Sequence, residues 1–146
     1  MMLCTFFGHS DCYGLDPKTL REGIEKLILS GVDTFYVGHQ GHFDAMVIST
    51  LSQLTEVYPN ISYSVVLAYL PTQKDEHDEY HGRSLYPEGL ETVHPRFAIE
   101  RRNKWMIERA DHCLCYINHT HGGAYKFARM AKRKGLVVVN LGSEEL

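Results

Sequence analysis

Residues 113–131 read CLCYINHTHGGAYKFARMA, and this stretch decides the fold. Its first five residues form a short apolar run typical of a β-strand, and Phe127, Ala128 and Ala131 follow at helical spacing. The polar loop between them ends in Gly122 and Gly123. A strand that leads through a glycine-containing loop into a helix is typical of the β-α units of a parallel sheet.

The rest of the chain alternates between apolar runs and helical segments in the same way. Further strands are expected at residues 3–7 and 34–37, within residues 61–70, and at residues 137–141. Further helices are expected at residues 16–31, at residues 43–58, and from Pro95 to about Ala110. Residues 71–94 follow neither pattern and predict a long loop. The sequence therefore predicts a Rossmann-like three-layer α/β domain, with a mostly parallel sheet of about five strands flanked by helices.

The composition is typical of a single globular domain over residues 1–146. The chain is 44% hydrophobic, enough for a substantial core at this length. Its formal net charge of -3 gives no global attraction to nucleic acid, so no nucleic-acid partner is expected. No apolar run approaches the roughly 20 residues of a membrane span, and the first residues lack the basic region of a signal peptide. We therefore expect no membrane partner and interpret the location as cytoplasmic.

The cysteines do not indicate the disulfide framework of a secreted protein. Cys4 and Cys113 are expected to be small core residues of strands. Cys113 and Cys115 alternate along one strand, so their thiols should point to the same face. This spacing also suits a metal site, but buried structural thiols are favoured.

Glycine-containing loops follow three of the expected strands. They are Gly8-His9-Ser10, the loop from Gly38 to Gly41, and residues 118–123. The carboxyl ends of parallel strands meet at one edge of the sheet, where ligands bind, so these loops should converge. Glycine lets backbone N–H groups approach an anion closely, and a helix start adds the positive end of a dipole. A tight turn is the alternative role of each glycine taken singly.

Histidines gather in the same loops and in residues 71–94. These are His9, His39, His42, His77, His81, His119 and His121. Imidazole is the commonest metal ligand, but these spacings come without a matching carboxylate pattern. We expect solvated or ligand-bonding histidines, and predict neither a metal nor a cofactor.

Two charged residues outside the glycine loops are candidates for the site. Arg102, in the helix before residues 113–117, can offer two donors to a phosphate, although a solvated basic face is the alternative. Asp44 lies in the first turn of an expected helix. It either caps that helix or accepts a hydrogen bond from a sugar hydroxyl.

Taken together, these motifs resemble the YpsA-like branch of the SLOG superfamily, the Rossmann-like group of the Smf/DprA and Lonely-Guy proteins. The resemblance spans essentially the whole chain. It is carried by Phe6-Phe7-Gly8-His9, Phe35-Tyr36-Val37-Gly38 with Gly41, Phe43 and Asp44, residues 65–69, Arg102-Asn103 with Met106, Asp111, and Gly122-Gly123-Ala124. It implies a fold that binds nucleotides or their derivatives, and in some members hydrolyses an N-glycosidic bond. It also implies a homodimer formed through helices.

The chain departs from the Lonely-Guy pattern where that family carries its catalytic carboxylate. The family arginine falls on Arg102, but the glutamate position is occupied by Arg129 and the Gly-Thr pair by Tyr125-Lys126. An arginine cannot supply a carboxylate for glycosidic cleavage. Ser10 also stands where this branch usually has arginine. Glu88, Glu91 and Glu100 are candidate replacement carboxylates.

The leading hypothesis is a domain that binds or senses a phosphorylated nucleotide derivative, either ADP-ribose-like or a nucleoside phosphate. The first alternative is an N-glycosidase of the phosphoribohydrolase type with a relocated carboxylate. The second is a protein-interaction module in bacterial cell-division or stress regulation. The expected ligand-binding residues are Gly8, His9, Ser10, Gly38, Gly41, Asp44, Arg102, Asn103, Met106, Gly122, Gly123 and Ala124.

Overall fold

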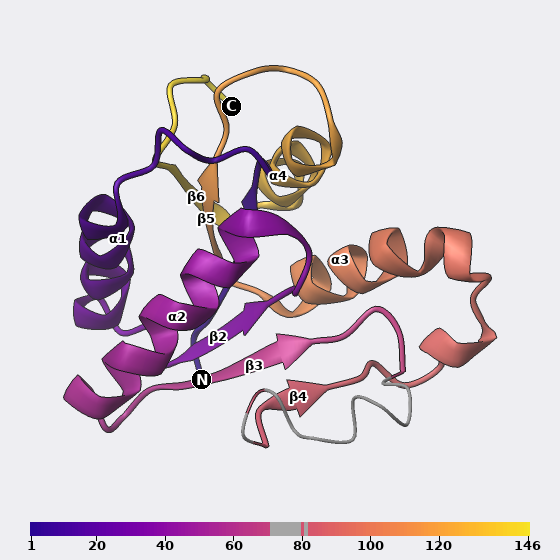
Figure 1. Ribbon diagram of the computed structural model, residues 1–146, viewed down its shortest axis with the longest axis horizontal. Coiled ribbons are helices and arrows are strands. Elements are labelled where there is room, and N and C mark those ends of the chain that lie inside the picture. The colour runs from indigo at the N-terminus through magenta and orange to yellow at the C-terminus, as the bar shows by residue number, and fades with distance from the viewer. Residues whose placement is uncertain (71–79, 81) are drawn as a thin grey trace.

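The computed structural model describes residues 1–70, 80 and 82–146. Within this part of the chain, six strands form one fully parallel sheet in the order β4-β3-β2-β1-β5-β6 (Figure 1). The strands are β1 (Leu3–Gly8), β2 (Thr34–Val37), β3 (Ser62–Val66), β4 (Ser84–Leu85), β5 (His112–Tyr116) and β6 (Val137–Asn140). The helices are α1 (Pro17–Leu29), α2 (Gly41–Val57), α3 (Ala98–Arg109) and α4 (Gly123–Lys134).

Helices cover both faces of the sheet. Along β1, Cys4 and Phe6 belong to one apolar core, whereas Phe7 belongs to the other. The first core includes buried apolar residues of α1 and α2, and the second includes buried apolar residues of α3 and α4. The predicted three-layer α/β domain of Rossmann type is therefore confirmed.

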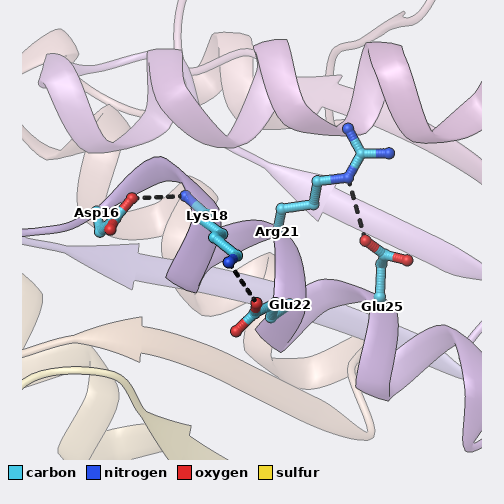
Figure 2. Close-up of polar contacts among 5 residues, drawn as sticks. All are labelled: Asp16, Lys18, Arg21, Glu22 and Glu25. Carbon is cyan, nitrogen blue, oxygen red and sulfur yellow. Dashed lines mark hydrogen bonds and ion pairs between the residues drawn. The ribbon is translucent and has the colours of Figure 1, made fainter.

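Helix α1 shows how local sequence produces its element. Asp16 precedes Pro17 and accepts a hydrogen bond from the backbone N–H of Lys18 at 2.9 Å, which caps the helix start. Ion pairs one turn apart, Lys18–Glu22 and Arg21–Glu25, lie on its solvent side (Figure 2). The buried stripe consists of Leu20, Ile24, Leu27 and Ile28, as the helical spacing predicts.

The direction in which successive strands are added to the sheet reverses beside β1. The chain adds β2, β3 and β4 outward on one side of β1, then returns to place β5 against the other side. In register, Gly8 at the end of β1 pairs with Tyr116 at the end of β5. The loops that follow β1 and β5 therefore leave the sheet together at the switch point, where open parallel sheets bind ligands.

The region predicted as one long loop contains structure that the sequence did not reveal. β4 pairs with the end of β3, and a short 3-10 turn occupies Leu90–Thr92. A helical segment does begin at Pro95, as the sequence predicts, but its first turn is a 3-10 turn and α3 begins only at Ala98. Two or three residues per element leave no measurable periodicity. The polar run at residues 74–79, with His77 and His81, lies outside the described residues.

The cysteines occupy the positions expected of small core residues. All four are buried and unpaired, and Cys113 and Cys115 belong to the same core. Burial raises the pKa of the Cys4 thiol, and the neighbouring Cys115 together with burial raises that of Cys113. In the described residues, no helix is both long and apolar enough to cross a membrane.

Candidate functional site

A narrow cavity of about 180 Å³ lies at the carboxyl edge of the sheet. It is enclosed by the ends of β1 and β2, by α2 and α3, and by the first turn of α4. We call it the arginine cavity after Arg102. Its lining is Phe6, Phe7, Gly8, Gly38, Gln40, Asp44, Ile99, Arg102, Asn103, Met106, Gly123, Ala124 and Phe127.

Arg102 is buried, with only 2% of its surface exposed, and is held by three hydrogen bonds. Its Nη1 donates to the carbonyl oxygen of Val66 at 2.8 Å, and its Nη2 to Oε1 of Gln40 at 2.5 Å. Its Nε donates to Oδ1 of Asn103 at 2.8 Å. A guanidinium carries five N–H groups, so these bonds leave one on each terminal nitrogen to meet an anion. The alternative of a solvated basic face is therefore wrong for Arg102.

Gly38 makes room for this guanidinium. A Cβ added to Gly38 would lie 2.9 Å from Cζ, Nη1 and Nη2 of Arg102, closer than real Cβ contacts allow. Burial lowers the pKa of Arg102 to about 10, while Asp44 and Tyr69 act in the opposite direction. The group stays charged at neutral pH. Gly38 is thus needed for a flat cation to pack against the backbone.

Asp44 both caps α2 and faces the arginine cavity. Its Oδ2 accepts a hydrogen bond from the backbone N–H of Gln40 at 3.0 Å, which satisfies a donor at the helix start. Burial raises the pKa of Asp44 to about 6, although the Gln40 bond and Arg102 lower it. The capping role is therefore present, and among the described residues no protein donor forms a hydrogen bond with the second carboxyl oxygen.

The start of α4 contributes a cluster of backbone donors. Gly122 is its N-cap, with a φ of 89° that favours glycine, and it has no side chain to accept from the first-turn N–H groups. No acidic residue lies in that first turn. The positive end of the helix dipole therefore meets the arginine cavity at Gly123 and Ala124, and α4 has no acidic residue of its own in that turn to neutralise it.

A second, larger cavity of about 550 Å³ lies on the other side of this helix start. It shares Gly8, Gly123 and Ala124 with the arginine cavity. We call it the histidine cavity, and its remaining lining is His9, Ser10, Asp11, His119, His121 and Gly122.

Three imidazole rings stack in the histidine cavity. The ring of His119 lies 3.6 Å from that of His9 and 3.8 Å from that of His121, with planes within 17° of parallel. His9 is buried and its Nε2 accepts a hydrogen bond from the backbone N–H of Asn118 at 3.1 Å. Nδ1 of His119 is shielded and has no hydrogen-bond partner among the described residues. Burial, together with His119, lowers the pKa of His9.

The neutral ring of His9 makes the fold sensitive to acid. A group whose pKa is lower in the folded than in the unfolded state contributes stability above its unfolded pKa, about 6.5 for histidine, and loses it as pH falls through the folded value. Protonation at Nε2 would also break the bond from Asn118. We expect a decrease in pH from 7.5 to 5 to destabilise wild type relative to His9→Gln, measured as the difference between their midpoints for chemical unfolding.

Comparing the pH dependence of wild type with that of His9→Gln isolates the contribution of His9 to stability, because Asp44 titrates in both proteins. The raised pKa of Asp44 acts in the opposite direction and stabilises the fold as pH drops below about 6. His42→Gln is the matched control, because His42 is exposed and stacks on Tyr13 outside both cavities. Equal pH slopes in wild type and His9→Gln, measured by urea unfolding, would contradict this account.

The structure brings most of the expected residues to these two cavities. Gly8, Gly38, Asp44, Arg102, Asn103, Met106, Gly123 and Ala124 line the arginine cavity. His9, Ser10 and Gly122 line the histidine cavity. Gly41 lines neither of them. A Cβ added to Gly41 would lie 3.2 Å from Cβ of Ser10, so the loops that follow β1 and β2 are in close contact at this point.

The candidate replacement carboxylates lie elsewhere. Glu88 lines a separate cavity beside Trp105. Glu100 is paired with Lys126 at 2.8 Å and with Lys104 at 3.5 Å. Neither these nor Glu91 line the arginine or histidine cavity, where the carboxylates are Asp44 and Asp11.

The sequence did not predict the contacts of three side chains at this edge. Gln40 holds Arg102, and His119 and His121 complete the ring stack. Each lies in a loop that the sequence placed at this edge, but sequence spacing does not reveal that Gln40 reaches Arg102 or that His119 stacks on His9. In the described residues, no three His, Cys, Asp or Glu side chains are grouped so that they could hold a metal ion.

Fold and cavities define a class: parallel α/β proteins with a cavity that contains a buried arginine at the carboxyl edge of the sheet. No family model matches the chain, and no curated protein matches it significantly.

Proposed function

We propose that this protein binds a phosphorylated nucleotide derivative, such as a nucleoside phosphate or an ADP-ribose-like molecule. The phosphate lies in the arginine cavity, between the start of α4 and the guanidinium of Arg102. The observation that carries the proposal is this pairing of a buried cation with an uncapped helix start across one small cavity.

The geometry favours a compact anion at this point. A cavity of about 180 Å³ lies below the usual 300–1,000 Å³ of ligand pockets, so it suits one anionic group rather than a whole nucleotide. The larger histidine cavity meets it at the helix start and offers room for the rest of the molecule. Asp44 supplies an acceptor for a sugar hydroxyl.

Removal of Arg102 tests the proposal. Because hydrogen bonds to charged groups contribute about 1.5–3 kcal/mol, Arg102→Ala should weaken the binding of AMP and ADP-ribose roughly 10- to 100-fold. Isothermal titration calorimetry measures the affinities, with adenosine as the ligand that lacks phosphate. Arg101→Ala is the matched control, since Arg101 is an exposed neighbour on the same helix.

Arg102 also supports the fold, so a second variant is needed. Arg102→Lys keeps the charge, but its three N–H groups cannot reproduce the planar arrangement of five donors in the guanidinium, so it should weaken binding by a similar factor. Circular dichroism establishes that each variant is folded. Wild-type affinity in a folded Arg102→Ala protein, or failure of AMP and ADP-ribose to bind at all, would remove the proposed site.

The proposal extends to the family and the setting. Assignment to the YpsA-like branch of the SLOG superfamily is supported by the order along the chain of the glycine loops, Arg102-Asn103 and Gly122-Gly123-Ala124. We further propose a cytoplasmic location and a homodimeric state. The partner is a nucleotide-type small molecule, and the role of the protein is to sense this molecule rather than to turn it over.

One observation favours a second candidate, an N-glycosidic hydrolase. Asp44 is a carboxyl group in the arginine cavity whose pKa burial raises to about 6, close to the range of catalytic acids and bases. Its Oδ2 is already engaged by the backbone of Gln40. Binding without turnover remains the better-supported function, because the carboxylates expected from the sequence lie away from both cavities.

A further inference from the structure

The histidine stack has one buried end and one exposed end. His9 is buried at the end of β1, His119 lies between the other two rings, and His121 is exposed to solvent while lining the histidine cavity. The stack therefore presents the flat outer face of His121 as a place for another planar ring. Stacking on an aromatic face is a general way for proteins to hold a nucleobase.

The charges in the two cavities differ. The arginine cavity contains the cation of Arg102 together with the carboxyl group of Asp44. The histidine cavity contains the carboxylate of Asp11 and no lysine or arginine among its described lining residues. A second phosphate in the histidine cavity would meet the carboxylate of Asp11 and the ring of His9, whose lowered pKa favours the neutral form. An uncharged planar group fits better there, and the carboxylate of Asp11 can accept a hydrogen bond from an amino group or a hydroxyl.

We infer that His121 is a base-stacking residue: the ligand places its phosphate in the arginine cavity and stacks its heteroaromatic base on the exposed ring of His121. This inference rests on the proposed function, and it narrows the ligand to a phosphate ester that carries a planar base. The shared residues Gly8, Gly123 and Ala124 make the two cavities neighbours, so one molecule can span both.

A pair of ligands separates the base from the phosphate. AMP and ribose 5-phosphate both carry the phosphate, but only AMP carries a base. Since stacking of a base contributes about 1–3 kcal/mol, AMP should bind wild-type protein roughly 5- to 150-fold more tightly than ribose 5-phosphate. His121→Ala should abolish this preference and leave the affinity for ribose 5-phosphate unchanged. His121→Phe retains a flat ring and should retain the preference.

His42→Ala is the matched control, because His42 is another exposed, ring-stacked histidine outside both cavities. The affinities are measured by calorimetry on variants whose thermal unfolding matches wild type. An unchanged AMP preference in His121→Ala, or equal binding of the two ligands to wild-type protein, would overturn the stacking inference while leaving the phosphate site in place. If neither ligand binds, the proposed function and the stacking inference both fail.

Discussion

Gly8→Ala should destabilise the protein by about 3 kcal/mol, which is roughly 100-fold in the folding equilibrium. An added Cβ would lie 2.3 Å from Cγ of Phe43, and 2.5 Å from both adjacent ring carbons. Phe43 is 1% exposed and packed within the first core, so its ring has little room to move. Gly8 does not have a positive φ, so the cost is steric rather than conformational. Urea unfolding followed by circular dichroism measures the loss.

A smaller side chain at position 43 should relieve the clash. Phe43→Leu costs stability alone, but Gly8→Ala combined with Phe43→Leu should be less destabilised than the sum of the single changes. Gly123→Ala is the control, because nothing lies within 4 Å of its added Cβ and it also lacks a positive φ. That change should be neutral or slightly stabilising. Additive effects at residues 8 and 43 would show that the steric account is wrong.

Base release from nucleoside monophosphates should be very slow or absent, even with bound ligand. The motivating feature is Arg129, which stands where the resembling Lonely-Guy enzymes carry glutamate. Loss of a positioned acid-base group typically costs about 10²- to 10⁴-fold in rate. The purified protein is incubated with AMP and related monophosphates, and released base is followed by chromatography. Binding and turnover should therefore separate.

Asp44 supplies the decisive control for turnover, because it is the carboxylate in the arginine cavity. Turnover on the order of 1 s⁻¹, abolished by both Arg102→Ala and Asp44→Asn, would replace the sensing proposal with the hydrolase. Turnover that survives in Asp44→Asn would instead direct the search to Asp11 in the histidine cavity. Wild-type protein without measurable base release is the expected result.

The sequence predicted the arrangement of the site better than its contacts. Gly8, Gly38 and Gly123 were expected at one edge because each lies near the end of a strand or the start of a helix. In the structure, two of these glycines also make room for a neighbouring side chain, a role beyond close approach to an anion. Gly8 packs against Phe43, and Gly38 against the guanidinium of Arg102. A glycine in the sequence does not reveal which distant side chain occupies the space left by its missing Cβ.

The sequence by itself determined the three-layer α/β class, the main helices and strands, and the edge at which the glycine loops converge. These features follow from short-range periodicity, from caps such as Asp16-Pro17, and from the rule that parallel strands share one carboxyl edge. Only the tertiary structure decided that Arg102 is buried and bonded to Val66 and Gln40, that His9 stacks on His119, and that Ser84–Leu85 forms a sixth strand. Each of these depends on contacts between residues far apart in the chain, or on an element too short to show a period.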